Sequence, residues 1–254
     1  MMLLSRIFPV LLLKSKGLYK GIKFKNHQYI GDPINTVKLF NDKEVDELAI
    51  LDIEATLKGI RPEYDYLESI ASEAFMPLAY GGGIKSIEDA KNIFSIGFEK
   101  IIIGTEATKN IDLIKKLSEQ FGSQSITISV DIGKNIFGKY IVYSRCGTRK
   151  TNINLTEYIN ILQKNGVGEI ILNNIDNDGK MLGYDTKIIK EISDICDVPL
   201  IALGGAGNIY DLKNGLIAGA HSVAAGSMFV YSGKQKGILI NYLSNSEINK
   251  VLEF

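Results

Sequence analysis

Two glycine-rich elements of this sequence carry the residue types that bind phosphate groups. In each element an apolar run ends in Gly-Gly, and the next apolar run ends in Gly-Thr or Gly-Ser. Glycines let backbone N–H groups approach an anion closely, the hydroxyl adds a donor, and a following helix N-terminus contributes partial positive charge. The residues are Gly82, Gly83, Gly104 and Thr105 in the first element and Gly204, Gly205, Gly226 and Ser227 in the second. The pattern predicts a phosphate site at each element; the alternative is that the glycines only permit tight turns.

The two elements are copies of one another, which favours the phosphate interpretation. A single offset of 122 residues relates the glycine pairs, and the same offset takes 45–48 to 167–170 and Gly97 to Gly219. An offset that serves several separate segments indicates an internal duplication. The ligand expected for two such sites is an elongated molecule with a phosphate at each end.

Polar residues near the ends of the apolar runs are the candidates for catalysis and substrate binding. Asp131 closes its run and is suited to act as a general acid or base on the middle of the ligand, the alternative being a carboxylate that caps a turn. Asp52 and Asp178 could each orient Lys20 or a ligand hydroxyl, or be structural. Lys20 itself is either a ligand contact or a surface lysine.

Four charged residues of alternating sign stand at the opposite ends of the runs. Arg6, Glu47, Lys100 and Glu169 each fall at or near the start of a run. If the runs are strands of one barrel, these residues form a closed ring of salt bridges over one end. Isolated ion pairs contribute little net stability. The ring is therefore either a structural plug or a gate over the bore.

Short β-branched apolar runs alternate with amphipathic stretches, which is the rhythm of a parallel βα sheet. The length of 254 residues is close to the roughly 250 typical of a (β/α)8 TIM barrel. We predict an α/β fold: a single (β/α)8 TIM barrel over 1–254, built from two similar half-barrels of about 1–122 and 123–254. The predicted strands are 6–13, 47–53, 78–82, 100–104, 125–131, 169–175, 200–204 and 222–227.

Two connections are longer than a minimal βα unit requires. Residues 20–33 follow the first predicted strand, and residues 135–150 follow the fifth, with a portion at 136–143 that alternates like a hairpin. Long loops after barrel strands usually lie at the active-site face. We therefore expect both connections near the ligand.

Charge and cysteine content exclude several classes of function. The 29 basic and 29 acidic residues balance, so neither nucleic acid nor a membrane surface is an expected partner. Cys146 and Cys196 form no CxxC motif and have neither His27 nor His221 near them in sequence, so we expect no metal, no cofactor and a reducing cytosol. The apolar segment 1–13 lacks a small-residue cleavage site, and we interpret it as a buried first strand rather than a signal peptide.

A series of short motifs, in order along essentially the whole chain, resembles the HisF family, the cyclase subunit of imidazole glycerol phosphate synthase. The series is specific because its members keep both their identity and their order. The motifs lie at 20–21, 31–33, 46–48, 51–53, 81–84, 121–124, 176–179, 183–185 and 204–207.

The resemblance implies a partner and a route for its product. HisF proteins receive ammonia from a HisH-like glutaminase on the amino face of the barrel, and the ammonia crosses the bore to a bisphosphorylated substrate. The charge ring would then be an ammonia gate, and Glu99 would lie at the partner interface. The implied phosphate contacts are Gly83 and Thr105 in one half and Gly179, Gly205, Gly226 and Ser227 in the other.

The sequence departs from the family at a catalytic position. HisF cyclisation uses two aspartates, at the ends of strands 1 and 5; Asp131 matches the second, whereas Leu12 stands at the first. Leucine transfers no proton, and loss of a positioned acid–base group costs on the order of 10²–10⁴ in rate. The related isomerase HisA needs the same pair and is disfavoured. Gly104 and Asn173 also replace polar side chains usual in the family.

Three functions follow as alternatives, and whether the chain is an enzyme depends on which holds. The preferred one rests on similarity, at 11–14, 31–35, 43–48 and 75–77, to a HisF-like branch of surface-polysaccharide loci. It predicts a subunit that supplies ammonia for amidination of a sugar, beside a glutaminase and a sugar amidotransferase. The second is a cyclase (a lyase) of histidine biosynthesis that tolerates Leu12. The third is a non-catalytic barrel that binds a phosphate ligand.

Overall fold

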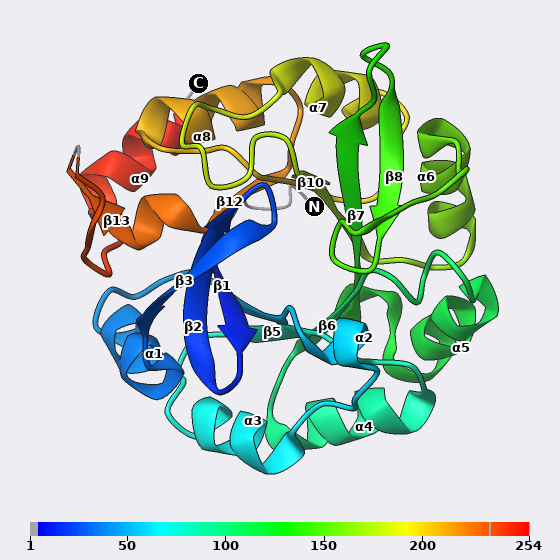
Figure 1. Ribbon diagram of the computed structural model, residues 1–254, viewed down its shortest axis with the longest axis horizontal. Helices are drawn as coiled ribbons and strands as arrows, with labels where there is room; N and C mark the ends of the chain where they lie inside the picture. Colours follow the sequence, from blue (N-terminus) through cyan, green and yellow to red (C-terminus); the bar gives the residue numbers. More distant parts are fainter. Residues whose placement is uncertain (1–4, 234, 254) are drawn as a thin grey trace.

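Eight parallel strands close into a barrel in the computed structural model, which describes residues 5–233 and 235–253. Each strand pairs in parallel with the next, and the last pairs with the first (Figure 1). The barrel strands are β1 (Ile7–Lys14), β4 (Leu48–Asp52), β5 (Leu78–Gly81), β6 (Lys100–Ile103), β7 (Ile126–Lys134), β10 (Glu169–Asn174), β11 (Leu200–Leu203) and β12 (Ser222–Ala225). The predicted (β/α)8 barrel is confirmed, and every predicted strand overlaps one of these.

Helices surround the barrel and carry the chain back from the end of one strand to the start of the next (Figure 1). Several begin at a side-chain cap: Ser86 and Asn154, for example, each accept a hydrogen bond from a backbone N–H of the first turn. As a result all eight strands end at one face, called here the carboxyl face. The helices are α1 (Pro33–Asn41), α2 (Ala55–Lys58), α3 (Tyr64–Ala71), α4 (Ile87–Ile96), α5 (Ile111–Phe121), α6 (Leu155–Lys164), α7 (Thr186–Ser193), α8 (Ile209–Ile217) and α9 (Asn245–Leu252).

The 122-residue offset seen in the sequence recurs in the elements. Shifting β5 and β6 by this offset reproduces the bounds of β11 and β12. The N-caps of α4 and α8, Ser86 and Asn208, differ by the same offset. In the closed order of the sheet, the pair β5 and β6 lies opposite the pair β11 and β12. The two glycine-rich elements therefore follow opposite sides of the barrel at one face.

The barrel strands are buried on both faces, as their continuous apolar runs predict. Leu48 and Ile50 point toward the helices, whereas Ala49 between them points into the bore. The bore is filled by Phe8, Val10, Ala49, Ala79, Ile102, Ile171, Ile201, Leu203 and Ala224. Because the side chains are packed both inside the bore and between the strands and the helices, the positions of the strand ends are fixed. The side chains at the carboxyl face are fixed with them.

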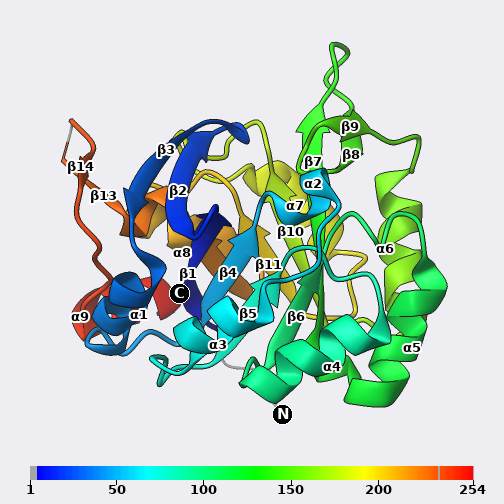
Figure 2. The ribbon, with the colours of Figure 1, turned by 60° about the horizontal axis from the view of Figure 1, so that its bottom comes forward.

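Two antiparallel hairpins rise from the carboxyl face (Figure 2). The connection 20–33, predicted only as a long loop, forms most of the β2–β3 hairpin. The predicted hairpin at 136–143 is right in kind but wrong in extent, because its first arm is β7 itself, which continues past Asp131 to pair with β8. The strands outside the barrel are β2 (Gly17–Ile22), β3 (Lys25–Gly31), β8 (Tyr140–Ser144), β9 (Arg149–Lys150), β13 (Tyr231–Ser232) and β14 (Gly237–Ile238).

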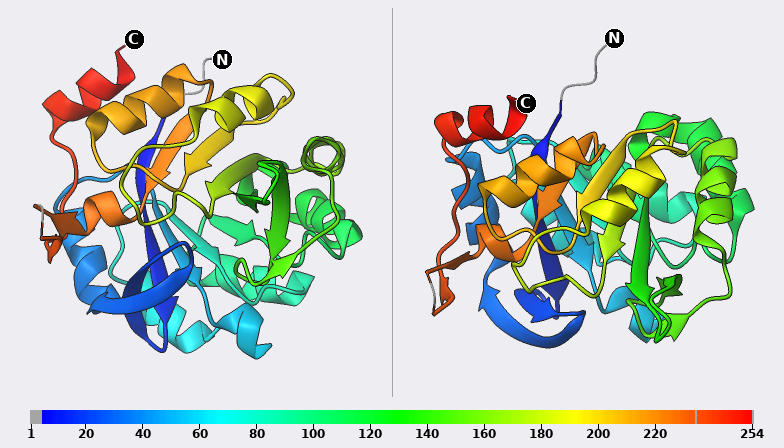
Figure 3. Two further views of the ribbon diagram at one scale, coloured as in Figure 1. Left: turned by 45° about the horizontal axis from the view of Figure 1, so that its top comes forward. Right: turned by 90° about the horizontal axis from the view of Figure 1, so that it is seen from above.

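The described chain begins at the amino end of the barrel and ends on its outside, at α9. α9 packs beside α8 (Figure 3). Residues 1–4 of the apolar amino-terminal segment lie outside the described residues, and from Ile7 the segment forms β1, as predicted. None of the helices that the structure describes is long and apolar enough to span a membrane.

Candidate functional site

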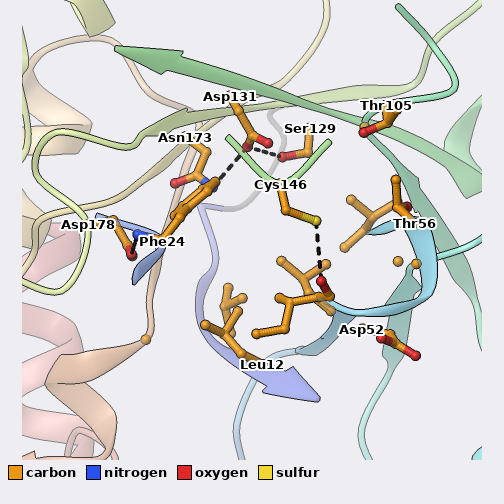
Figure 4. Close-up of a pocket in the computed structure, with 18 of the residues that line it drawn as sticks. Leu12, Phe24, Asp52, Thr56, Thr105, Ser129, Asp131, Cys146, Asn173 and Asp178 are labelled. Atoms are coloured by element: carbon orange, nitrogen blue, oxygen red, sulfur yellow. Dashed lines mark hydrogen bonds between the residues drawn. The ribbon is translucent and has the colours of Figure 1, made fainter. Parts of the chain in front are cut away.

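A pocket of about 180 Å³ opens at the carboxyl face, at the mouth of the bore (Figure 4). We call it the mouth pocket. Its walls come from the ends of the barrel strands and from the loops and hairpins that follow them. Because parallel strands all end at this face, residues far apart in sequence meet here. The predicted site residues that line the pocket are Lys20, Asp52, Gly82, Thr105, Asp131, Asp178 and Gly226.

Asp131 is a half-buried carboxylate in the wall of the mouth pocket. Its Oδ1 accepts hydrogen bonds from Asn173 Nδ2 (3.1 Å) and Ser129 Oγ (3.3 Å), drawn as dashed lines in Figure 4. Burial raises the pKa of Asp131 to about 7, although both hydrogen bonds act to lower it. A carboxyl group that titrates near neutral pH can both accept and donate a proton, which suits general acid–base catalysis.

The strand-1 side of the mouth pocket is apolar. Leu12 lies there together with Leu51 and Ile53. Asp52, at the end of the neighbouring strand, does not take the place of an acid at Leu12, because its Oδ1 accepts two backbone N–H groups at 2.8 and 2.9 Å and caps the turn into α2. The mouth pocket thus presents a proton-transferring group on one side and a hydrocarbon wall on the other.

Lys20 reaches into the mouth pocket from β2 and is almost completely buried. Its Nζ donates a hydrogen bond to the Val10 carbonyl and lies over Gly226, where a Cβ atom would collide with it. Burial lowers the pKa of Lys20 to about 8, while the charge of Asp178 raises it. Among the described residues neither Asp52 nor Asp178 forms an ion pair with Lys20, and the hydrogen bond to Val10 fixes its position. That either aspartate orients Lys20 or a ligand hydroxyl stays a prediction.

The glycines of the two predicted phosphate elements divide into two groups. Gly82, Gly104 and Gly226 line the mouth pocket, together with Thr105. The Thr105 Oγ1 accepts the Arg145 backbone N–H at 2.7 Å and keeps its own hydrogen for another acceptor. A Cβ on Gly83 would lie 2.8 Å from the Ile60 carbonyl, so this glycine is needed for loop packing. The predicted residues that do not line the pocket are Gly83, Gly179, Gly204, Gly205 and Ser227. Their contact with phosphate stays a prediction.

Several residues of the mouth pocket were not singled out from the sequence. Phe24 and His27 come from the β2–β3 hairpin, and Cys146 and Thr148 follow β8. The Cys146 thiol donates to the Ile53 carbonyl at 3.5 Å, and burial raises its pKa to about 12, so it stays protonated and is a poor nucleophile. Loop length indicated both segments as parts of the site, but no pattern within them distinguished the side chains that point inward.

At the amino end of the bore, the four predicted charges form a closed ring. Arg6 pairs with both Glu47 and Glu169, and Lys100 Nζ lies 3.1 Å from Glu47 and 3.0 Å from Glu169. Thr127 Oγ1 also donates to Glu169 at 3.3 Å. Each acid therefore holds two cations, and both acids are buried. Glu99 is exposed just before β6, on the same face.

Removing one cation of the ring is expected to destabilise the barrel. Lys100→Met leaves two buried carboxylates that share one arginine, and breaking a buried ion network typically costs about 3–5 kcal/mol. Urea unfolding at pH 7 measures the change in the free energy of unfolding. Lys115→Met, which removes an exposed lysine 4.0 Å from Glu119, is the matched control and should change it by about 0.5 kcal/mol or less. Equal stability of the two variants would contradict the interpretation.

Comparison with known proteins agrees with this architecture. A family model described as histidine biosynthesis protein matches residues 6–236. A protein of Leptospira borgpetersenii, provisionally named imidazole glycerol phosphate synthase subunit HisF, is 47% identical over 97% of this chain and 98% of its own length. The chain belongs to the HisF family.

Other HisF relatives carry similar names. A Vibrio vulnificus protein, provisionally named imidazole glycerol phosphate synthase subunit hisF3, is 46% identical over 99% of this chain and 98% of its own. The imidazole glycerol phosphate synthase subunit HisF of Alkaliphilus metalliredigens is 36% identical over 91% and 92%. These names support the histidine-biosynthesis alternative better than the preferred prediction of sugar amidination, which none of them supports.

Proposed function

We propose that this HisF-family chain is the ammonia-accepting synthase subunit of a glutamine-dependent complex, and that its substrate carries a phosphate at each end. The observation that carries the proposal is the alignment of three features along one bore. A closed charge ring covers the amino end, apolar side chains fill the middle, and the acid–base carboxylate Asp131 stands at the carboxyl end. Such a path is suited to neutral ammonia, because an apolar bore can pass a small uncharged nucleophile.

The proposed route for ammonia begins at a HisH-like glutaminase bound to the amino face, where Glu99 is exposed. Beyond the ring, Ala49, Ala79 and Ala224 contribute only methyl groups to the bore. Lys100 reaches the ring by a flexible four-carbon stem, so its displacement is the smallest change that would open a path. An apolar bore excludes ammonium and water from the path, because a charge is costly to bury without a partner.

The proposed substrate spans the mouth pocket. On one side, Gly82 and the Thr105 hydroxyl offer donors for a phosphate; on the other, the ammonium of Lys20 lies beside Gly226. Between them, Asn173 Oδ1 is buried and lacks a hydrogen-bond partner in the described part of the chain. An N–H or O–H group in the middle of the substrate would supply the missing donor.

The names of the relatives favour imidazole formation as the reaction. The apolar wall at Leu12 favours a second candidate, nitrogen transfer to a phosphorylated sugar with a sugar amidotransferase as third partner, because cyclisation in the resembling family uses a carboxylate at that position. In either case Asp131 is the group that moves the proton.

An assay with two nitrogen sources tests the proposal. The chain is incubated with the bisphosphorylated substrate of imidazole glycerol phosphate synthase and ammonium chloride, and then with glutamine and a HisH-like glutaminase. We expect turnover with free ammonia, and glutamine-dependent turnover only when the glutaminase is present. Glutaminase activity that is unchanged on mixing, together with no turnover from either source, would refute the proposal. Turnover of a phosphorylated sugar alone would select the second candidate.

A further inference from the structure

A second cavity lies beside the mouth pocket, outside the barrel wall. Its volume of about 270 Å³ exceeds that of the mouth pocket, and it opens between the ends of β1 and β4 and the helices α2 and α3. A single buried water needs only about 15 Å³, so this cavity has room for a small organic molecule. We call it the side cleft. Its polar lining includes Lys16, Asp52, Glu54, Lys58, Glu63 and Tyr80.

Tyr80 lines the side cleft and carries an unused hydrogen-bonding group. Its side chain is 0% exposed and packs edge-on against Phe98, and its hydroxyl has no partner in the part of the chain that the structure describes. An unsatisfied buried hydroxyl costs about 1–3 kcal/mol, and buried polar groups in native proteins are normally paired. Burial holds the pKa of Tyr80 well above its usual range, and the charges of Asp52 and Glu63 act in the same direction. The group is thus a neutral hydroxyl near two carboxylates.

The charges of the side cleft leave one carboxylate unbalanced. Lys16 Nζ lies 3.2 Å from Glu63, and Lys58 Nζ lies 2.9 Å from Glu54, so these four residues neutralise one another. Asp52 has no such cation among the residues that the structure describes. Its two backbone hydrogen bonds both go to Oδ1, which leaves Oδ2 available. In Figure 4 its carboxylate is directed away from the other labelled residues of the mouth pocket.

We propose that the side cleft binds a small organic cation, a primary ammonium on a short apolar tail, through the Asp52 carboxylate and the Tyr80 hydroxyl. An ammonium group has three donors and no acceptor, which matches a free carboxylate oxygen and a phenol oxygen. Leu13 and Leu67 give the tail an apolar surface. A neutral alcohol would lack the attraction to Asp52, and an organic carboxylate would be repelled by it. The site goes beyond the proposed function, because it lies outside the bore.

Titration with butylammonium chloride, followed by NMR of the ¹⁵N-labelled chain at pH 7 and constant ionic strength, tests the site. Butanol and butyrate serve as matched neutral and anionic probes. We expect saturable shifts at the amides around the side cleft, weaker binding of butanol and no binding of butyrate. Tyr80→Phe should weaken butylammonium about 2- to 10-fold, the range of one hydrogen bond. Tyr158→Phe removes another buried hydroxyl without a described partner, on α6, and should leave the affinity unchanged.

Three outcomes would overturn the proposal: butanol that binds as tightly as butylammonium, an affinity that Tyr80→Phe does not change, or shifts confined to the mouth pocket. Asp52→Asn adds an independent check, since loss of the charge should weaken binding more than loss of the hydroxyl. The titration needs neither a glutaminase nor a phosphorylated substrate. A titration without binding would therefore refute the side-cleft site but not the proposed function. A synthase assay without turnover would bear on the proposed function but not on the side-cleft site.

Discussion

Replacing Asp131 with asparagine is expected to lower turnover with free ammonia by about 10²–10⁴-fold, the usual contribution of a positioned acid–base group. Asparagine keeps the shape of the side chain and its contact with Asn173, but it cannot exchange a proton. The loss should appear in kcat rather than in KM, because binding of the substrate's phosphates does not involve this carboxylate. Steady-state kinetics of the variant beside the unmodified chain measure it.

The pH dependence of the same reaction gives a second readout. The pKa of Asp131 is raised to about 7, so its carboxylate form becomes the major form only above that pH. If it removes a proton, the rate at a constant concentration of unprotonated ammonia should rise through about pH 7 and then level off. Asp131→Asn should abolish this rise. A rise that persists in the variant would assign the titration to another group.

Asp131→Asn should lower activity but raise the free energy of unfolding above neutral pH. A carboxyl group whose pKa is raised on folding binds protons more tightly in the native state, so the native state loses stability as pH rises from about 4 to about 7. Asp131→Asn removes this loss. The variant should therefore gain free energy of unfolding relative to the unmodified chain at pH 8 and gain little at pH 4. Ser95→Ala, an exposed position on α4 in the outer layer of helices, is a control that should show no such pH dependence.

Replacing Leu12 with aspartate is expected to raise the rate of imidazole formation from free ammonia by about tenfold or more. The substitution places a second carboxylate at the end of β1, where the apolar wall now stands, and the full contribution of such a group is on the order of 10²–10⁴. A second negative charge across the mouth should also raise the pKa of Asp131 further. A shift of the acidic limb of the pH–rate profile to higher pH measures that effect.

Leu12→Asn is the matched control, since it has nearly the same shape and polarity but transfers no proton. If the aspartate variant is no faster than the asparagine variant, Leu12 is not what limits imidazole formation, and the sugar-directed candidate gains support. If both variants are as fast as each other and faster than the unmodified chain, the apolar wall acts by shape rather than by acid–base chemistry.

Local sequence patterns were enough to predict the barrel fold of this protein and the positions of its strands. Continuous apolar runs fixed the eight strands, since strands buried on both faces leave no polar side of their own. The offset of 122 residues showed that the two glycine-rich elements share a face. Asp131 and the ring residues Arg6 and Lys100 were found because a strand's two ends lie at opposite ends of a barrel. The position of a residue along its strand therefore indicates at which end of the barrel it lies.

What the sequence by itself determined is thus the barrel, its family and the placement of charges at its two ends. Only the tertiary structure decided which contacts the individual side chains make. Asp52 caps a turn, and the Val10 carbonyl holds Lys20. The inward direction of Cys146, and the Tyr80 hydroxyl that has no partner among the described residues, likewise depend on loops that pack from distant parts of the chain. Such contacts follow no local period, because they are fixed by long-range packing, and so they have no signature in the order of residues.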